Sequence, residues 1–589
     1  MSQQAPEPRV RRLVRPSFAS AVCALALGAS AALSAQQGPE LPSHPEARQS
    51  FVPGPAEPAA EPASPAIPHP GRDGGPGTGG EPATVNLADL TVREVPPAAG
   101  RPLFHLQGEE AQADRGFDPA FAFSRTTEAI DSTRPEVAST LTSSGEVRTN
   151  FAGLSSTGWI PPDIVMAVGP SHVVQAVNSG FAIFSKNGSA QQGYTTFDSF
   201  FAPVKPAGWS GFLFDPRVLY SPEHGKFVML ALGLDQTNLG SYLYVAVSQT
   251  TNPTGVWWVW RINSNFAGLT GDAWLDYAGL AADSWGIYAT GNYYFWAGGF
   301  KYSTIISLNP AMFSGGSSNG WQFVNLQWPS ASVAFGLQPA LPLSIAGGAE
   351  TYFLNSFFSF GNQLLLWTLT GDRTSSPTLV RSTVGTTSYD SILQNVDQPG
   401  SATHLDGGDA RIMNAYYSQR RVYGTLTSDT NANTTSSGAF VAKINVDTKL
   451  TEWNVTVDGG PGWYYFYPAL AIGDAVSTTP SVSLFLSWTH PASNRFASSA
   501  VKTYLRPPLH QAGPFPSLAL GQAAYVSLDG NNRNRWGDYQ GAAFDFTNGT
   551  VWGSVEHAGT GNSWRTQVAE LSAALFADGF ETGNTNLWQ

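Results

Sequence analysis

Short strand-like segments separated by turn residues fill the chain from about residue 157 to residue 571, and this pattern limits the possible folds more than any other feature. Runs of about four to eight residues rich in Val, Ile, Tyr, Phe, Trp and Thr alternate with turns built from Gly, Asn, Asp, Ser and Pro. Apolar residues with helical spacing are nearly absent. The sequence therefore predicts an all-β domain of successive antiparallel strands.

The strand-like segments also group in fours. One such unit takes about fifty residues and comprises the segments 215–220, 226–230, 242–248 and 257–262. Similar units begin near residues 162, 275, 338, 409, 467 and 537. Four-stranded units that repeat in this way are the blades of a β-propeller. We expect six to seven blades, and the number of unit starts favours seven.

Two further features agree with a closed ring of blades. The element 276–283 (Asp-Tyr-Ala-Gly-Leu-Ala-Ala-Asp) is similar to 538–545 (Asp-Tyr-Gln-Gly-Ala-Ala-Phe-Asp), as expected of a repeated unit. The last unit shows only three strand-like segments, 540–546, 550–556 and 564–571. An N-terminal strand could supply the fourth and cover the exposed edge.

Composition divides the whole chain into five parts. Residues 1–35 combine arginines, an apolar run and small residues at a cleavage point, which is typical of an export signal peptide. Residues 36–82 are rich in Pro, Gly, Ala and Glu and are expected to form a disordered spacer. A lead-in segment at 83–150 could supply the closing strand. The propeller is expected over 151–575, and 576–589 form a tail.

Charge, hydrophobicity and cysteine content limit the possible partners and the ways in which the fold can be stabilised. The formal net charge is -12, and charged residues make up only 13% of the chain. Clustered Lys and Arg residues are missing, so we expect no nucleic acid as a partner. No run of about 18 apolar residues follows the signal peptide, so we expect no membrane span. The single cysteine, Cys23, lies in the signal peptide, so a large apolar core must hold the mature domain without disulfides.

Several short motifs carry a resemblance to known proteins. The segments 161–163 (Pro-Pro-Asp), 252–255 (Asn-Pro-Thr-Gly) and 535–539 (Arg-Trp-Gly-Asp-Tyr) together resemble secreted bacterial propeller proteins related to the sialidase-like superfamily. Sialidase-type propellers carry a Ser-x-Asp-x-Gly-x-Thr-Trp box as a fold marker, of which 559–564 (Gly-Thr-Gly-Asn-Ser-Trp) keeps only the Gly-x-Ser-Trp half. The end, 576–584, resembles the Asp-Gly-Phe-Glu-Ser-Gly tail of exported proteobacterial proteins.

Carboxylates stand at or just before the first strand of several units. The first strands of propeller blades line a central channel, so these side chains should converge at one mouth. The predicted ligand-binding residues are Asp163, Asp215, Asp276, Asp409, Asp538, Arg217, Tyr277 and Tyr539. Converging carboxylates raise each other's pKa unless an arginine or a cation neutralises them. Ca²⁺ is the candidate cation, with Asp163, Asp215 and Asp538 as ligands. Alternatively, each aspartate only caps its own turn.

No complete catalytic motif is present, so enzymatic activity stays open. A sialidase-like glycoside hydrolase would need arginines for a carboxylate, a tyrosine nucleophile with a glutamate partner, and an acid. Residues of these types are Arg217, Arg411, Arg535, Arg565, Tyr277, Tyr467, Tyr539, Glu556 and Asp163. The candidate catalytic residues are Asp538, Tyr539, Asp276 and Arg535. A polysaccharide lyase would instead take its base from His172, His404, His557 or Tyr539.

Aromatic residues cluster at 257–260, 293–296 and 463–467. Neighbouring residues of a strand point to opposite faces, so either both faces pack against other blades or one face offers a platform for sugars. Together, these features favour a monomeric propeller that binds a glycan or a protein and is extracellular, attached to the cell surface or periplasmic. A glycan-cleaving enzyme and a purely structural scaffold protein are the alternatives.

Overall fold

The computed structural model describes residues 67–68, 73–93, 104–105, 147–326, 334–343, 349–357, 359–393, 395–430, 435–474, 477–504, 509, 515–529 and 531–572. All of them belong to one compact unit that starts at Pro53. The predicted signal peptide (1–35), most of the predicted spacer and the predicted tail (576–589) lie outside the described residues.

Successive meanders of antiparallel strands make up the described chain from β7 onward. The first two are β7 (Val165–Val168), β8 (His172–Val177), β9 (Gly180–Ser185), β10 (Ala190–Thr196), and β11 (Phe212–Ser221), β12 (Lys226–Asp235), β13 (Gly240–Ser248), β14 (Val256–Asn263). The next two are β15 (Ala273–Asp283), β16 (Gly286–Phe295), β17 (Phe300–Leu308), β18 (Gly320–Phe323), and β19 (Gln338–Pro342), β20 (Thr351–Asn355), β21 (Phe360–Asp372), β22 (Ser376–Asp390).

The remaining meanders follow the same order. They are β23 (Asn414–Ser418), β24 (Arg421–Asp429), β25 (Ser437–Asn445), β26 (Leu450–Val457), then β27 (Tyr464–Ile472), β28 (Val482–His490), β29 (Arg495–Tyr504), β30 (Ser517–Ala519), and last β31 (Gly541–Asp545), β32 (Thr550–Ala558), β33 (Trp564–Ser572). The last meander takes its fourth strand from an earlier part of the chain, β5 (Val147–Ser155).

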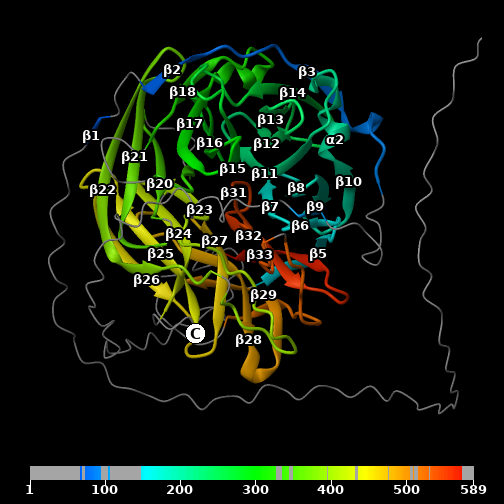
Figure 1. Cartoon of the computed structure of the whole chain (residues 1–589), viewed down its shortest axis with the longest axis vertical. Coiled ribbons are helices and arrows are strands. Elements are labelled where there is room, and N and C mark those ends of the chain that lie inside the picture. The colour runs from blue at the N-terminus through cyan, green and yellow to red at the C-terminus, as the bar shows by residue number, and fades with distance from the viewer. Residues whose placement is uncertain are drawn as a thin grey trace, which may run out of the picture. The chain divides into compact units, whose positions relative to one another are not determined.

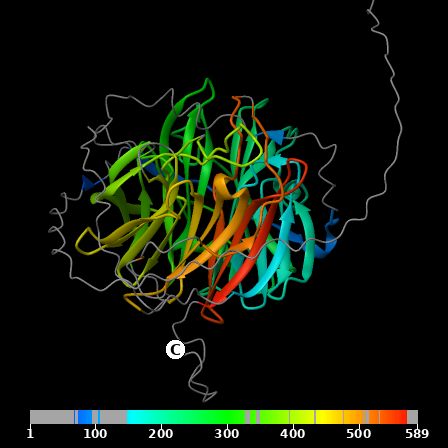
Figure 2. The ribbon, with the colours of Figure 1, turned by 90° about the horizontal axis from the view of Figure 1, so that it is seen from below.

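The first strands of the meanders lie next to one another around a common centre. Each packs against the next, from β7 through β11, β15, β19, β23, β27 and β31, and β31 packs back against β7. Figure 1 shows these strands inside and strands such as β10, β14, β18 and β22 outside. Figure 2, turned by 90°, shows the sheets standing side by side. Antiparallel sheets arranged radially in a closed ring form a β-propeller, so the predicted all-β propeller fold is present.

Both faces of the sheets are buried, which explains the nearly continuous apolar strands. In β12, every residue after Lys226 is buried. The aromatic clusters of the sequence serve the same packing: Trp257, Trp260, Tyr293 and Tyr465 are each 1% exposed or less. Removing such a side chain from water contributes about 1.5–3 kcal/mol. The interpretation that both faces pack against neighbouring blades is therefore correct for these residues.

A closing strand joins the two ends of the ring. In β5, Val147 pairs with Leu571 of β33 and Ser155 pairs with Arg565. The Gln175 side chain, from β8 of the first meander, accepts the backbone N–H of Leu154 at 2.7 Å. Its amide also donates to the hydroxyls of Ser554 and Thr566 in the last meander. An N-terminal strand thus closes the ring, although only its first four residues, 147–150, belong to the predicted lead-in segment, and a buried amide secures the junction.

A second N-terminal segment, residues 73–93, runs along the outside of the ring, and we call it the belt. Its strand β2 (Gly74–Gly77) pairs with the outer edge of β18, and β3 (Ala83–Asn86) pairs with that of β14. Farther upstream, β1 (Ile67–Pro68) pairs with β22. The prediction of a disordered spacer up to residue 82 is therefore wrong for residues 73–82.

Main-chain pairing explains the error in the spacer prediction, because it needs few apolar side chains. An unpaired sheet edge offers N–H and C=O groups to any extended segment. Glycine lets the belt approach closely: a Cβ atom at Gly77 would lie 2.1 Å from the Phe266 ring, and one at Gly79 would lie 2.1 Å from the carbonyl carbon of Ser318. The glycines that suggested disorder are what the pairing requires.

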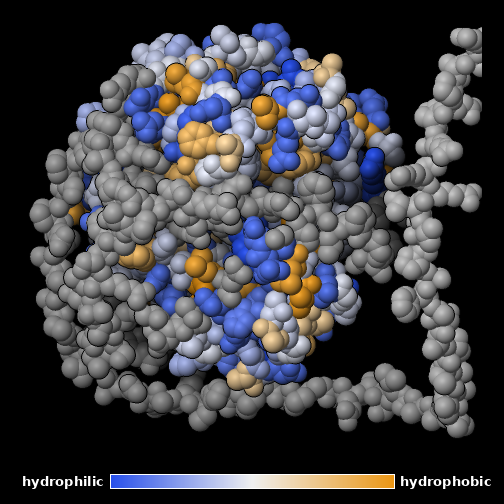
Figure 3. Space-filling model, in the orientation of Figure 1, coloured by the Kyte–Doolittle hydropathy of each residue, from blue (hydrophilic) through white to orange (hydrophobic). Residues whose placement is uncertain are grey.

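The surface shows no large apolar face in the view of Figure 3, where apolar residues are scattered among hydrophilic ones. The large exposed apolar side chains, for example Leu239, Trp285 and Leu520, come from separate loops. Within the described ranges, no helix is long and apolar enough to cross a membrane.

Candidate functional site

A repeated bulge lies in the first strands of several meanders. The register between neighbouring strands shifts at Asp215 in β11, at Tyr277 in β15 and at Tyr467 in β27. These three residues have φ angles of 48°, 51° and 48°, and Asp163, just before β7, has 47°. The left-handed conformation costs a non-glycine residue about 1–2 kcal/mol. Four recurrences of it indicate that the bulge serves a purpose common to several meanders.

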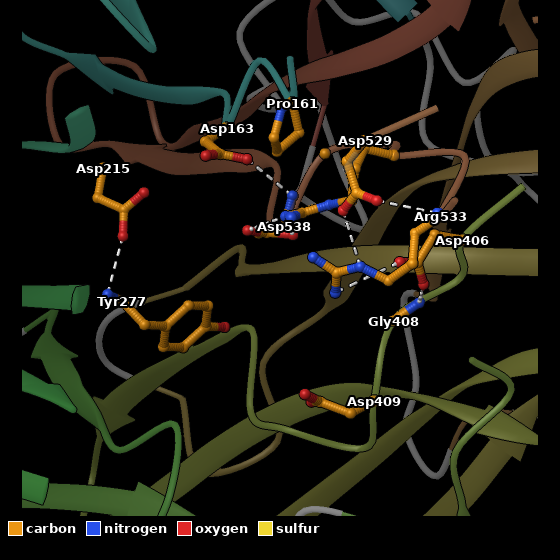
Figure 4. A network of polar contacts seen from close by, with 12 residues as sticks. Pro161, Asp163, Asp215, Tyr277, Asp406, Gly408, Asp409, Asp529, Arg533 and Asp538 are labelled. Atoms are coloured by element: carbon orange, nitrogen blue, oxygen red, sulfur yellow. Dashed lines mark hydrogen bonds and ion pairs between the residues drawn. The ribbon is translucent and has the colours of Figure 1, made fainter. Parts of the chain in front are cut away.

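The bulge turns a backbone N–H toward a polar side chain of another part of the ring. Tyr277 N–H donates to Asp215 Oδ2 at 2.8 Å, and Asp215 N–H donates to Asn178 Oδ1 at 2.8 Å. Asn178 in turn donates its side-chain amide to Asp163 Oδ2. Across the ring closure, Asp538 N–H donates to Asp163 Oδ1 at 2.8 Å. Figure 4 shows the contacts of Asp163 and Asp215 at the centre of the ring.

Arginines neutralise several of the central carboxylates. Arg411 forms a bidentate ion pair with Asp409, its Nε lying 2.7 Å from Oδ1. The ion pair of Arg535 with Asp538 has N···O distances of 2.6 and 2.7 Å. Arg533 donates to Asp529 at 3.0 Å. Forked guanidinium to carboxylate bonds are strong when buried, so these pairs stabilise the centre.

Two tyrosines and a further arginine stack in the same region. The Arg217 guanidinium lies 3.5 Å from the centre of the Tyr539 ring and donates to the carbonyl of Ala278 at 2.5 Å. Arg411 lies 4.3 Å from the centre of the Tyr277 ring. The rings of Tyr277 and Tyr539 meet edge to face at 6.0 Å. Contacts thus connect Asp163, Asp215, Asp538, Arg217, Tyr277 and Tyr539 of the predicted ligand-binding residues, and Asp409 joins them through Arg411, while the Asp276 side chain bonds to the N–H of the adjacent Tyr277.

The residues of this centre are buried. We call the carboxylates, arginines and tyrosines described in the three paragraphs above the buried polar ring. Its predicted ligand-binding residues are 0–7% exposed, Arg217 having the largest exposed fraction. Burial, together with the charges of Asp538 and Asp215, raises the pKa of Asp163 well above its usual value. Burial likewise raises the pKa of Asp406 to about 6 and that of Glu556 well above normal. Burial therefore favours the neutral form of each of these carboxyl groups more than water does.

Arginines balance part of the negative charge of the buried polar ring. Among the described residues, no group of three or more His, Cys, Asp or Glu side chains is arranged to hold a metal ion. Of the predicted Ca²⁺ ligands, Asp163 and Asp215 each accept a backbone N–H, and Asp538 accepts the Arg535 guanidinium. Asp276 accepts the N–H of the next residue, Tyr277, at 3.0 Å, as a turn-capping role would require. The assignment of these residues to ligand binding, metal binding or catalysis stays a prediction.

The histidines considered for lyase chemistry lie in different parts of the fold. His172 begins β8, and His404 lies in the segment before β23, where it pairs with Asp397 at 3.3 Å. His557 lies in β32 opposite Arg565, and burial with that charge lowers its pKa to about 4. His557 is therefore neutral at physiological pH and sits in a strand of the core.

An open cavity of about 260 Å³ lies beside the buried polar ring, and sequence reasoning missed it. Its described lining residues are Arg93, Thr157, Trp159, Ser179, Tyr194, Thr196, Phe197, Asp198, Phe212 and Leu213. Trp159 precedes β7 and Phe212 begins β11, while Ser179 lies in the turn from β8 to β9. These positions share one end of the first two meanders, where the first strands begin.

The cavity wall combines aromatic and hydroxyl groups. The rings of Trp159 and Phe212 lie 5.7 Å apart and are both partly exposed. Ser179 Oγ is 2.7 Å from the Tyr194 hydroxyl and donates to the hydroxyl of Thr157 at 3.2 Å. Since Asn178 bonds to Asp163 and Asp215, the neighbouring Ser179 is held by the buried polar ring.

The only available sequence signal for this cavity is weak. Trp159 and Phe212 are single aromatic residues at the start of a unit, and 53 positions separate them. Nothing in their spacing distinguishes them from the many aromatic residues of the core. The topology of the first two meanders is what brings them together.

Comparisons with known proteins show a distant likeness in fold. No protein-family model and no curated protein matches the sequence. A neuraminidase-like protein of subtype N10 from A/little yellow-shouldered bat/Guatemala/060/2010 matches with 8% identity and a TM-score of 0.32, covering 62% of this chain and 100% of its own. The alpha-L-arabinanase of Cellvibrio cellulosa matches with 13% identity and a TM-score of 0.28, covering 61% and 95%. The alpha-L-arabinofuranosidase of Lactobacillus brevis matches with 9% identity and a TM-score of 0.27, covering 60% and 95%.

Proposed function

We propose that the protein is an exported β-propeller that binds an extracellular carbohydrate in the cavity beside Trp159 and Phe212. The observation that carries the proposal is a concave site with two partly exposed aromatic rings and several hydroxyl groups. Aromatic faces pack against the apolar C–H face of a sugar. The hydroxyls of Thr157, Ser179 and Thr196 both donate and accept hydrogen bonds, as sugar hydroxyls do.

The size of the cavity favours a small ligand over a protein surface. Its volume of about 260 Å³ lies near the lower end of the roughly 300–1,000 Å³ range of small-molecule sites. Such a cavity accommodates one sugar ring or the end of a chain. A protein partner would instead cover roughly 800 Å² of surface on each side.

Binding is a better proposal than cleavage at this site. Hydrolysis of glycosides generally needs two carboxyl groups on either side of the scissile bond. Asp198 is the one carboxylate among the described lining residues, and it pairs with Lys205. The other candidate acids belong to the buried polar ring, where substrate has no access in this conformation.

The proposal includes the architecture and the location of the protein. We infer seven blades, one for each first strand in the closed series from β7 to β31. Export rests on the signal-peptide features of residues 1–35, and a monomer is expected because the ring closes within one chain. A glycan outside the cytoplasm, free or attached to a surface, is then the expected partner.

A glycan array followed by calorimetry with the mature chain tests the proposal. Trp159→Ala and Phe212→Ala should each weaken binding roughly tenfold or more, because they remove a large aromatic contact. Trp285→Ala is the matched control: Trp285 is 46% exposed in the turn between β15 and β16, at the other end of the sheet. Failure of the mature chain to bind any glycan contradicts the proposal, and binding unaffected by either variant removes it from this cavity.

A further inference from the structure

The belt ends at the cavity proposed to bind carbohydrate. After β3, the buried side chains of Val85 and Leu87 anchor the belt, at 5% and 1% exposure. Leu87 N–H donates to the carbonyl of Gly255 at 3.2 Å. The belt then crosses from the second meander to the first, where Arg93 N–H donates to the carbonyl of Tyr194 at 3.0 Å. This bond places Arg93 in the cavity wall.

Close packing fixes this end of the belt. A Cβ atom at Gly193 would lie 2.3 Å from Cγ1 of Val92, so the glycine makes room for the belt directly before Arg93. Gly193 has no left-handed φ angle, since it is absent from the residues with positive φ. Close approach to the belt is therefore the constraint that the structure shows at this position.

The charges at the cavity are unequal. Asp198 is neutralised by its ion pair with Lys205. Arg93 is exposed, and no described carboxylate pairs with its guanidinium. Among the described lining residues, Arg93 therefore contributes a positive charge that no described carboxylate offsets, in a chain whose formal net charge is -12. A guanidinium presents a planar fork of donors that matches a carboxylate with two parallel bonds.

We propose that Arg93 selects a carbohydrate that carries a carboxylate, so that the belt supplies the charge specificity of the cavity. The inference rests on the proposed function and adds its ligand class, an acidic sugar. It also makes specificity depend on the docking of the belt, because Arg93 is held at the cavity by the belt's own contacts, among them its N–H bond to Tyr194 and the packing of Leu87 and Val92. The core of the cavity, built from the first two meanders, binds the sugar ring itself.

Paired ligands that differ only in charge test this inference. A panel of oligouronates and their methyl esters is titrated into the full mature chain by calorimetry. We expect the acids to bind roughly tenfold tighter than the esters. Salt should weaken binding of the acids but not of the esters, since a partly exposed ion pair is screened.

Three variants test whether Arg93 is the source of the preference for acids over esters. Arg93→Gln should abolish the difference between acid and ester, and Arg93→Lys should keep part of the difference. Gly193→Ala, which pushes on Val92, should also reduce it. Arg148→Gln is the control, because Arg148 is an exposed arginine on β5 that does not line the cavity.

The outcomes separate this inference from the proposed function. Equal binding of acids and esters by the unsubstituted protein, or a preference that survives Arg93→Gln, overturns the role of Arg93 while glycan binding stands. Binding of no acid, no ester and no other glycan overturns the proposed function itself.

Discussion

The buried polar ring and the cavity beside Trp159 lie at the same end of the first two meanders, yet they use their polar groups differently. In the ring, carboxylates and guanidinium groups bond to one another and to backbone N–H groups, and the predicted ligand-binding residues are at most 7% exposed. In the cavity, hydroxyl groups and aromatic rings stay partly open to solvent. A dense set of charged side chains therefore does not mark a binding site when those side chains already form hydrogen bonds and ion pairs with one another.

The physical cost of the buried polar ring explains its composition. A buried charge without a partner is strongly unfavourable, whereas a paired and hydrogen-bonded charge is tolerated. Some of its bonds are local, as in the pairs Arg411–Asp409 and Arg535–Asp538, whereas the bonds of Asp163 with Asp538 and of Asp215 with Tyr277 join different meanders. The ring thus joins neighbouring blades.

The largest effect is expected where a buried ion pair is broken. Asp538→Ala removes the carboxylate that accepts two hydrogen bonds from the Arg535 guanidinium, whose side chain is 2% exposed. We expect the free energy of unfolding to fall by about 3–5 kcal/mol, measured by urea denaturation. The control, Asp447→Ala, removes an exposed partner of Arg420 and should lower the free energy of unfolding far less, because solvent screens an exposed pair. Similar small losses for both variants would contradict a structural role of the ring.

A smaller effect is expected in the pH dependence of stability. Folded Asp406 has a pKa of about 6, whereas an unfolded aspartate has a pKa of about 4. Between these values the folded protein binds more protons than the unfolded chain, so the free energy of unfolding falls as pH rises. Asp406→Asn cannot ionise and should flatten this decline in melting temperatures measured from pH 4 to pH 7. An unchanged slope would show that Asp406 is not buried as an acid.

The smallest effect is expected on glycan affinity when a residue of the buried polar ring that does not line the cavity is changed. Asp529→Asn alters the buried pair with Arg533 and should leave glycan affinity within about twofold, a change of less than about 0.5 kcal/mol. Calorimetry of this variant beside Trp159→Ala sharpens the comparison between the two regions. A loss as large as that of Trp159→Ala would place the ligand in the ring.

The blade pattern could be predicted because it depends on local sequence, namely on strand segments and the turn residues between them. Segments such as 215–220 and 226–230 alternate with turn residues and become strands of one meander, and the unit starts at Asp215, Tyr277 and Tyr467 carry the bulge. The convergence of the acids followed from the propeller topology. Their burial did not, because it depends on contacts between meanders, such as the bond from Asp215 N–H to Asn178 and the stacking of Arg411 on Tyr277.

The belt and the cavity could not be predicted from local sequence. The belt binds through main-chain pairing at Gly74–Gly77, where a sparse apolar content suggests disorder. The cavity depends on Trp159 and Phe212, which resemble core aromatic residues until the topology places them together. Both features depend on contacts between distant segments, which composition and residue spacing do not reveal.

A crystal structure of the mature chain with a bound oligosaccharide tests most directly whether the cavity, and not the buried polar ring, is the ligand site. The account predicts a sugar ring against Trp159 and Phe212, with the hydrogen bonds of Asp163 and Asp538 unchanged. A sugar or a cation among Asp163, Asp215 and Asp538, with the cavity beside Trp159 empty, would contradict it.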